Sequence, residues 1–167
     1  TINCINTHLG SIDYSSEKLS FSNRQKVKQQ VQLNELVHFI HDNNCNLPLF
    51  VGADLNISET NDNSFWFPKP NKEYRDIIKK LGLVDSFRQI HPDEPGHTFS
   101  NKNSYKNAAA GPDLRIDYLF HAHYRDAVIP QKSKVIFNQP IEKNNESFFL
   151  SDHFGIMTEY QFKIKKG

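Results

Sequence analysis

The segment "LPLFVGADLN", residues 47–56, decides the fold that we expect for this chain. Its first five residues form a short apolar run typical of a strand, and Gly52 opens that run into a polar turn. Asp54 and Asn56 are two positions apart, so in extended backbone their side chains point the same way. The segment therefore predicts a buried strand that brings an acid and an amide to one place. An ordinary turn is the alternative interpretation, because Gly, Asp and Asn are common turn residues.

Helices and strands alternate on both sides of this segment. Apolar residues at three- and four-residue steps predict helices over 24–42 and 72–81, and Gly82 is a typical helix stop. We expect strands over 2–8, from about 97, and in "LRIDYLFHAHY", "SKVIFNQP" and "HFGIMTEYQFKI", with His121 at a sheet rim. Residues 100–113 are expected to form a mobile loop, and 138–148 a polar connection. This interleaving favours an α/β arrangement.

Composition limits the class of protein. A chain of 167 residues with 37% hydrophobic and 23% charged residues fits one globular domain. The net charge of +1 disfavours a plain nucleic-acid-binding module. No apolar run approaches the roughly 18 residues of a membrane span. Because Thr1 already lies at the start of an expected strand, we expect residues 1–167 to be a fragment of a larger domain.

Polar side chains stand at three further strand ends. "NTH" ends with His8, "RIDY" contains Asp117, and "SDH" contains Asp152 and His153. Ligand sites in α/β folds collect at strand ends and in the adjoining loops. Four such places in a domain of this size predict a shared pocket.

The chemistry of these residues suggests a hydrolytic site. His153 can act as a base near neutral pH, since an unperturbed imidazole has a pKa of about 6.5. Asp117 is an acid in an apolar strand and needs a partner. It can orient an imidazole in one tautomer, or it can pair with Arg115 on the same strand face. Asp152 points elsewhere and can bind a metal, or it can cap a strand together with Ser151.

Four motifs in this order, "INTHL", "VGADLN", "RIDYLF" and "LSDHFGI", resemble the C-terminal half of the endonuclease/exonuclease/phosphatase superfamily. That superfamily includes deoxyribonuclease I, apurinic endonucleases, inositol polyphosphate 5-phosphatases and neutral sphingomyelinases, and the last group looks closest. The stretch "GLVDSFRQIHPDEPGHTFS" is also similar to the superfamily. The resemblance implies an α/β fold of the α+β sandwich type. The chain would be half of a two-sheet sandwich flanked by helices, with mainly one mixed sheet and two main helices.

The resemblance also implies catalytic roles. His153 would be the general base that activates the attacking water, Asp117 would orient His153, and Asp54 would position the water. Asn56 would bind a phosphoryl oxygen. His8 would bind the phosphate, stabilising the phosphorane or assisting the leaving oxygen.

A divalent metal completes the implied site. Members of the superfamily use Mg²⁺, or Mn²⁺ in vitro, to neutralise charge and polarise the P–O bond. Asp152 would lie at or near that metal. The principal metal-binding Glu belongs to an N-terminal half that precedes the "NTHL" motif and is absent from this sequence. We therefore expect weak or no activity from the chain alone. We also expect the missing half, or a second copy of the chain, to cover an exposed sheet face.

The expected function is metal-dependent hydrolysis of a phosphodiester. The expected substrates, in order, are a sphingomyelin-like lipid, a nucleic acid, and an inositol phosphate or another phosphomonoester. Substrate choice is expected to depend on loops such as 57–72 and 100–113. The alternative is a catalytically incomplete remnant that acts by binding or assembly.

Overall fold

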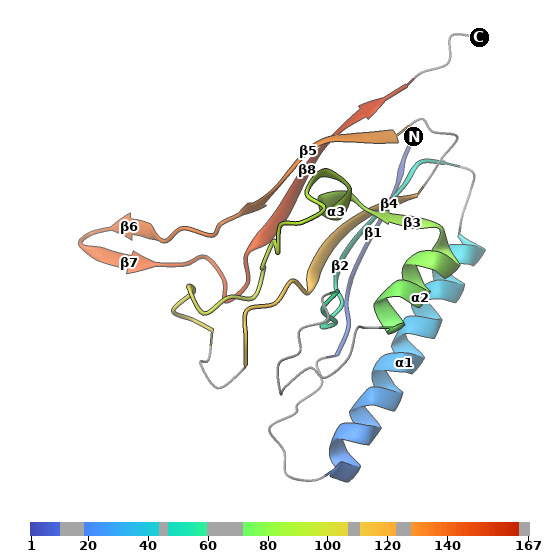
Figure 1. Ribbon diagram of the computed structural model, residues 1–167, viewed down its shortest axis with the longest axis horizontal. Helices are drawn as coiled ribbons and strands as arrows, with labels where there is room; N and C mark the ends of the chain where they lie inside the picture. The colour runs from blue at the N-terminus through green and yellow to red at the C-terminus, as the bar shows by residue number, and fades with distance from the viewer. Residues whose placement is uncertain (11–18, 44–46, 60–71, 107–110, 123–127, 164–167) are drawn as a thin grey trace.

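The structure is a computed structural model that describes residues 1–167 except 11–18, 44–46, 60–71, 107–110, 123–127 and 164–167 (Figure 1). Its described residues form an α+β fold in three layers. Helices α1 and α2 cover one face of a mixed four-stranded sheet, and the β5–β8 pair covers part of the other face. The expected fold class is confirmed. The elements are β1 (Asn3–His8), α1 (Leu19–Asp42), β2 (Leu49–Asp54), α2 (Lys72–Leu81), β3 (Leu83–Asp85), α3 (Ser86–Ile90), β4 (Asp117–Ala122), β5 (Val128–Ile136), β6 (Ile141–Lys143), β7 (Glu146–Phe148) and β8 (Gly155–Phe162).

Strand β2 is the centre of the four-stranded sheet, whose order is β1-β2-β4-β3. It pairs in parallel with β1 and antiparallel with β4, and β3 completes the sheet on the far side of β4. Alternate residues of β2 face the helices. Leu49, Val51 and Ala53 are buried in the main core. Side chains from α1, α2 and β4 complete that core, including Leu33, Ile40, Tyr74, Tyr118 and Phe120.

A second contact joins the opposite face of the sheet to β8. The Phe50 ring lies edge-on to the Tyr160 ring, with centroids 4.8 Å apart. The Ser86 hydroxyl lies 2.9 Å from His121 Nδ1 and 2.5 Å from the Tyr160 hydroxyl. On β1, by contrast, Cys4 and Asn6 of this face are exposed. The uncovered part of this face along β1 is therefore partly polar.

Several expectations from the sequence need correction. Strand β2 continues through Gly52 to Asp54 instead of ending before it. Residues 138–148 contain the β6–β7 hairpin, which extends away from the three layers (Figure 1). His121 is only 1% exposed and is not a rim residue, because β8 covers it. Residues 100–106 are anchored rather than loose, with Asn103 fully buried.

Most of the loop 57–72, on which substrate choice is expected to depend, lies outside the described residues. No helix in the described part of the chain has the length and apolar character that a membrane crossing requires.

Arg115 is at the centre of a buried ionic cluster. It precedes β4, is 1% exposed, and donates from Nη1 to Asp85 Oδ2 at 2.6 Å. Its other terminal nitrogen pairs with Glu59. Arg88 binds the same Glu59 carboxylate, with its Nη2 atom 2.9 Å from Glu59 Oε2. The Arg115–Asp117 pair that the sequence left open does not form, because Arg115 points to these two other acids.

Replacing Arg115 should strongly destabilise the fold. Arg115→Met leaves the buried Asp85 without its ion-pair partner and leaves Glu59 with Arg88 alone, and we expect a loss of about 3–5 kcal/mol in the free energy of unfolding. Urea unfolding measures this loss. The control is Lys132→Met, which breaks an exposed pair with Glu159 at 3.5 Å and should cost less than about 1 kcal/mol. Equal losses in the two variants would contradict the buried ion pairing of Arg115.

Candidate active site

Three polar side chains lie in one row across the sheet because of strand register. His8 at the end of β1 is opposite Asp54 at the end of β2. Asp54 is in turn opposite Asp117, the first residue of β4. Backbone hydrogen bonds continue the pairing just beyond the strands, from Leu9 N to Asp54 O at 2.9 Å and from Leu55 N to Ile116 O at 3.0 Å. The row is therefore held by main-chain bonds on both sides.

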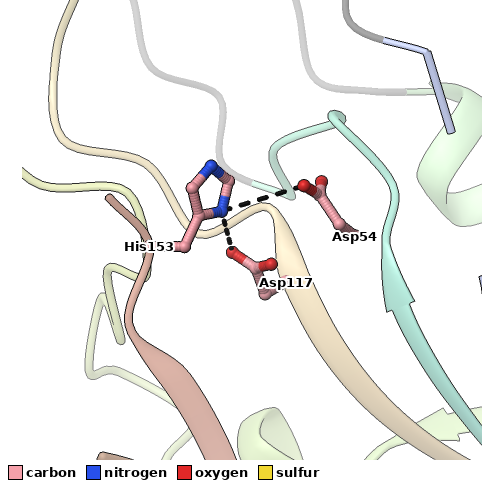
Figure 2. Close-up of side chains that lie close together, drawn as sticks. All are labelled: Asp54, Asp117 and His153. Atoms are coloured by element: carbon pink, nitrogen blue, oxygen red, sulfur yellow. Dashed lines mark hydrogen bonds and ion pairs between the residues drawn. The ribbon is translucent and has the colours of Figure 1, made fainter. Parts of the chain in front are cut away.

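The loop before β8 adds an imidazole to this row. His153 Nδ1 lies 2.9 Å from Asp117 Oδ2 and 3.8 Å from Asp54 Oδ2 (Figure 2). Asp117 Oδ2 can accept a hydrogen bond from Nδ1–H, which selects the tautomer whose Nε2 carries a lone pair. The geometry thus provides an imidazole oriented by one carboxylate, with a second carboxylate beside it.

Asn56 and His8 form the other end of the site. Asn56 lies beyond β2 with a positive φ of 50°, so it meets Asp54 through a turn and not by strand alternation. Its backbone N–H donates to Asp54 Oδ1 at 2.8 Å, and its side-chain Nδ2 donates to Leu9 O at 2.7 Å. Asn56 Nδ2 is also 3.2 Å from His8 Nε2.

His8 has two alternative partners at one nitrogen. Its Nε2 lies 3.3 Å from Asp54 Oδ2 and 3.2 Å from Asn56 Nδ2. A protonated Nε2 donates to Asp54, whereas an unprotonated Nε2 accepts from Asn56. The same ring can therefore act as a donor or as an acceptor, and its largely exposed side chain leaves room for a ligand.

All six residues singled out in the sequence border one open cleft of about 470 Å³. Asp152 is the most peripheral of them: it is exposed, and its Oδ1 lies 3.3 Å from the Ser151 hydroxyl. Phe99 also lines the cleft, with its ring centroid 4.9 Å from that of His153. Sequence reasoning did not assign Phe99 to the site. The cleft is lined by His8, Asp54, Asn56, Phe99, Asp117, Ser151, Asp152 and His153.

Two pKa values in the cleft are raised above their ordinary values. The pKa of Asp54 is raised above its ordinary value, first by burial and then by the nearby Asp117 carboxylate. The pKa of His153 is also raised, and the largest cause is its hydrogen bond to Asp117. Burial opposes that rise, while the charges of Asp117, Asp54 and Asp152 add to it. The cleft therefore favours a positive charge.

Hard oxygen donors in the cleft suit Mg²⁺ better than a softer metal. Asp54 and Asp152 offer carboxylates, and Asn56 offers an amide oxygen. Among the described residues, the group whose ligand atoms come within 4.8 Å of one another is Asp54, Asp117 and His153. Two of those three are already paired with each other. The described residues fit Mg²⁺ in ligand type but are few, so the remaining ligands would be water, substrate or another segment.

Comparison with solved structures identifies the fold of the chain. No family model matches the chain, and no curated protein matches it by sequence. Among solved structures, TDP2 of D. rerio, complexed with a single strand DNA product, has a TM-score of 0.63 at 21% identity. The match covers 93% of this chain and 54% of that one. An endonuclease/exonuclease/phosphatase family protein of Bacteroides thetaiotaomicron has a TM-score of 0.57 at 18% identity, and the match covers 96% of this chain and 50% of that one. The 3'-5' exonuclease of Neisseria meningitidis has a TM-score of 0.61 at 17% identity, and the match covers 93% of this chain and 60% of that one.

The chain thus has the fold of an endonuclease/exonuclease/phosphatase protein, which confirms at the level of the fold the resemblance seen in its motifs. It spans between 50% and 60% of the length of these three structures.

Removing the Asp117 carboxylate should lower the pKa of His153. In Asp117→Asn the main cause of the raised value is lost while the opposing effect of burial remains. The pKa should therefore fall, so that the ring becomes neutral at a lower pH. NMR titration of the His153 ring in metal-free buffer measures this change. Asp152→Asn is the matched control and should lower the pKa less, because Asp152 makes the smallest of the contributions that raise it. An unchanged His153 pKa in Asp117→Asn would contradict the pairing.

Proposed function

We propose that this chain is a metal-dependent phosphoesterase domain that hydrolyses a phosphodiester with a water activated by His153. The observation that carries the proposal is the 2.9 Å contact between His153 Nδ1 and Asp117 Oδ2. That pair lies in the same cleft as Asp54, Asn56 and His8. A base, its orienting acid and groups that can hold a phosphoryl group are the parts that water attack on phosphorus needs.

Proton transfer from the attacking water is assigned to His153 and Asp117. Asp117 accepts a hydrogen bond from the Nδ1–H group, which leaves the lone pair of Nε2 free to take a proton from the water. The imidazolium that forms stays paired with Asp117 and close to Asp54. Asp54 accepts the second hydrogen of the water and so orients its lone pair toward phosphorus.

The phosphoryl group is assigned to Asn56 and His8. Asn56 Nδ2 keeps one hydrogen on Leu9 O at 2.7 Å, which fixes the direction of the amide. Its other hydrogen faces His8 and can be given to a phosphoryl oxygen instead. His8, when protonated, donates to the developing negative charge or to the leaving oxygen.

Asp152 is assigned to Mg²⁺ or Mn²⁺. The bound ion would neutralise phosphate charge and polarise the P–O bond. The cleft lining offers the phosphate no Lys or Arg among the residues that the structure describes. Charge neutralisation by a metal ion is therefore central to the proposal.

The substrate class follows the order expected from the sequence. A sphingomyelin-like lipid comes first because the motifs look closest to neutral sphingomyelinases. A nucleic acid comes second, and D. rerio TDP2, with its single strand DNA product, and the Neisseria exonuclease support it by fold alone. An inositol phosphate or another phosphomonoester comes third.

A single-turnover assay tests the reaction. Excess protein with Mg²⁺ is mixed with choline phospholipid vesicles, DNA, phosphoinositides and an activated aryl phosphodiester. His153→Ala should lower the rate by roughly 100-fold or more, because the base contributes about 10²–10⁴-fold. His41→Ala, an exposed histidine on α1, should leave it unchanged. Full turnover in His153→Ala would exclude the proposed base.

A binding or assembly role is the second candidate. The chain spans about half of the solved structures that share its fold, and the resemblance assigns the principal metal-binding Glu to a half that this sequence does not contain. We therefore expect turnover by the 167-residue chain to be weak while the phosphate site stays intact. Inorganic phosphate titrated with Mg²⁺ should shift the NMR signals of His8 and Asn56. Rapid multiple turnover by the chain would refute the expected weakness, and unshifted signals would refute the phosphate site.

A further inference from the structure

We propose that Thr98 is a positioning residue that holds Asp117 and His153 at hydrogen-bonding distance. The inference rests on the proposed function, in which this pair activates the attacking water. Thr98 lies in the stretch before the Phe99–Leu114 bridge and is completely buried. It does not line the active-site cleft, so any influence on the reaction passes through the two residues that it holds.

The Thr98 side chain fixes the start of β4. Its Oγ1 accepts hydrogen bonds from Ile116 N and from Asp117 N, each at 3.2 Å. Its backbone N–H donates to Leu114 O at 2.9 Å. One hydroxyl oxygen thus accepts two main-chain hydrogen bonds at the point where the chain enters β4, and one of them comes from Asp117.

The Thr98 backbone fixes the loop that carries His153. Phe154 N donates to Thr98 O at 2.7 Å. Phe154 follows His153 directly and is itself buried. Thr98 therefore binds Asp117 through its side chain and the neighbour of His153 through its carbonyl, so a single residue sets the spacing of two segments that are 36 positions apart.

A nearby residue holds the other end of the same loop. Asn103 is 1% exposed, and its Nδ2 donates to Ser151 O at 2.7 Å. The Ser151 hydroxyl accepts from His153 N at 3.1 Å. With both ends of the loop fixed to residues 98–103, the imidazole has little freedom to turn away from Asp117.

The chemistry of the position calls for a hydroxyl. Thr98 is fully buried, so water does not replace its Oγ1 atom as an acceptor. An apolar substitute therefore leaves the N–H groups of Ile116 and Asp117 without that acceptor. Val has nearly the shape of Thr but no acceptor, whereas Ser keeps the hydroxyl and loses only a methyl group. Cys keeps a weak acceptor of similar size. The series Ser, Cys, Val therefore weakens the acceptor stepwise with little change in volume.

The first test is spectroscopic and does not depend on activity. In the unmodified chain, the Nδ1 proton of His153 should be protected from exchange with water and give an NMR signal typical of a hydrogen bond to a carboxylate. Thr98→Ser should keep that signal, Thr98→Cys should weaken it, and Thr98→Val should lose it. Thr158→Val is the matched control: it removes a hydroxyl that bonds to Ser133 Oγ at 2.9 Å on the β5–β8 pair, and it should keep the signal. If Thr98→Val does not fold, the positioning role is tested by comparing the Nδ1 proton signal of Thr98→Cys with that of Thr98→Ser.

The second test compares rates. Thr98→Val should lower kcat by roughly 10- to 100-fold with little change in KM, since a misplacement of about 1 Å costs up to about 10²-fold. Thr98→Ser should restore most of the rate. A protected Nδ1 proton in both Val and Cys variants would overturn the positioning role even if the chain is active. A lost proton in a chain that hydrolyses no phosphoester would support the role of Thr98 while the proposed function fails.

Discussion

The hydrogen-bond register of β2 with its two neighbours is the constraint on which the site depends. Leu49, Val51 and Ala53 face the helices, so the alternate residues of β2 must face the opposite layer. This parity sends Asp54 to the side of the cleft, and pairing with β1 and β4 places His8 and Asp117 beside it. A slip of one residue would exchange the two faces of the strand and bury Asp54 in the apolar core. The packing of the helices therefore fixes the face of the sheet on which Asp54 lies, and with it the face that carries His8 and Asp117.

The charges gathered by this register favour the binding of a cation in the cleft. Burial and the Asp117 carboxylate raise the pKa of Asp54, and the acids together raise the pKa of His153. An anionic phosphate approaching such a cleft meets repulsion unless positive charge is added. Lys106 is not available to supply that positive charge, because its ammonium group donates hydrogen bonds to Gly111 O and Pro112 O. The divalent metal ion of the proposed function would supply that positive charge.

The sequence predicts those parts of the fold that depend on local pattern. Helix α2 and its stop at Gly82, strand β1 and the meeting of the polar strand ends follow from periodicity and from the position of strand termini. The β6–β7 hairpin was missed although Asn144 and Asn145, both with positive φ, are a recognisable turn signal. The burial of His121 had no local signal, because it depends on β8 crossing over β4. Thr98 was missed for the same reason, since its partners lie far along the chain.

Both flanks of the site are anchored by buried polar groups instead of apolar side chains alone. Arg115 stands two residues before Asp117 and binds Glu59, which stands three residues after Asn56. Apolar packing fixes how deeply a segment is buried, but hydrogen bonds and ion pairs also fix its direction, because they depend on angle as well as distance. A buried ionic cluster contributes little net stability compared with an apolar core of equal volume. Its presence beside the cleft is therefore better explained by the placement of the strand ends that carry Asp54 and Asp117 than by the stability of the fold.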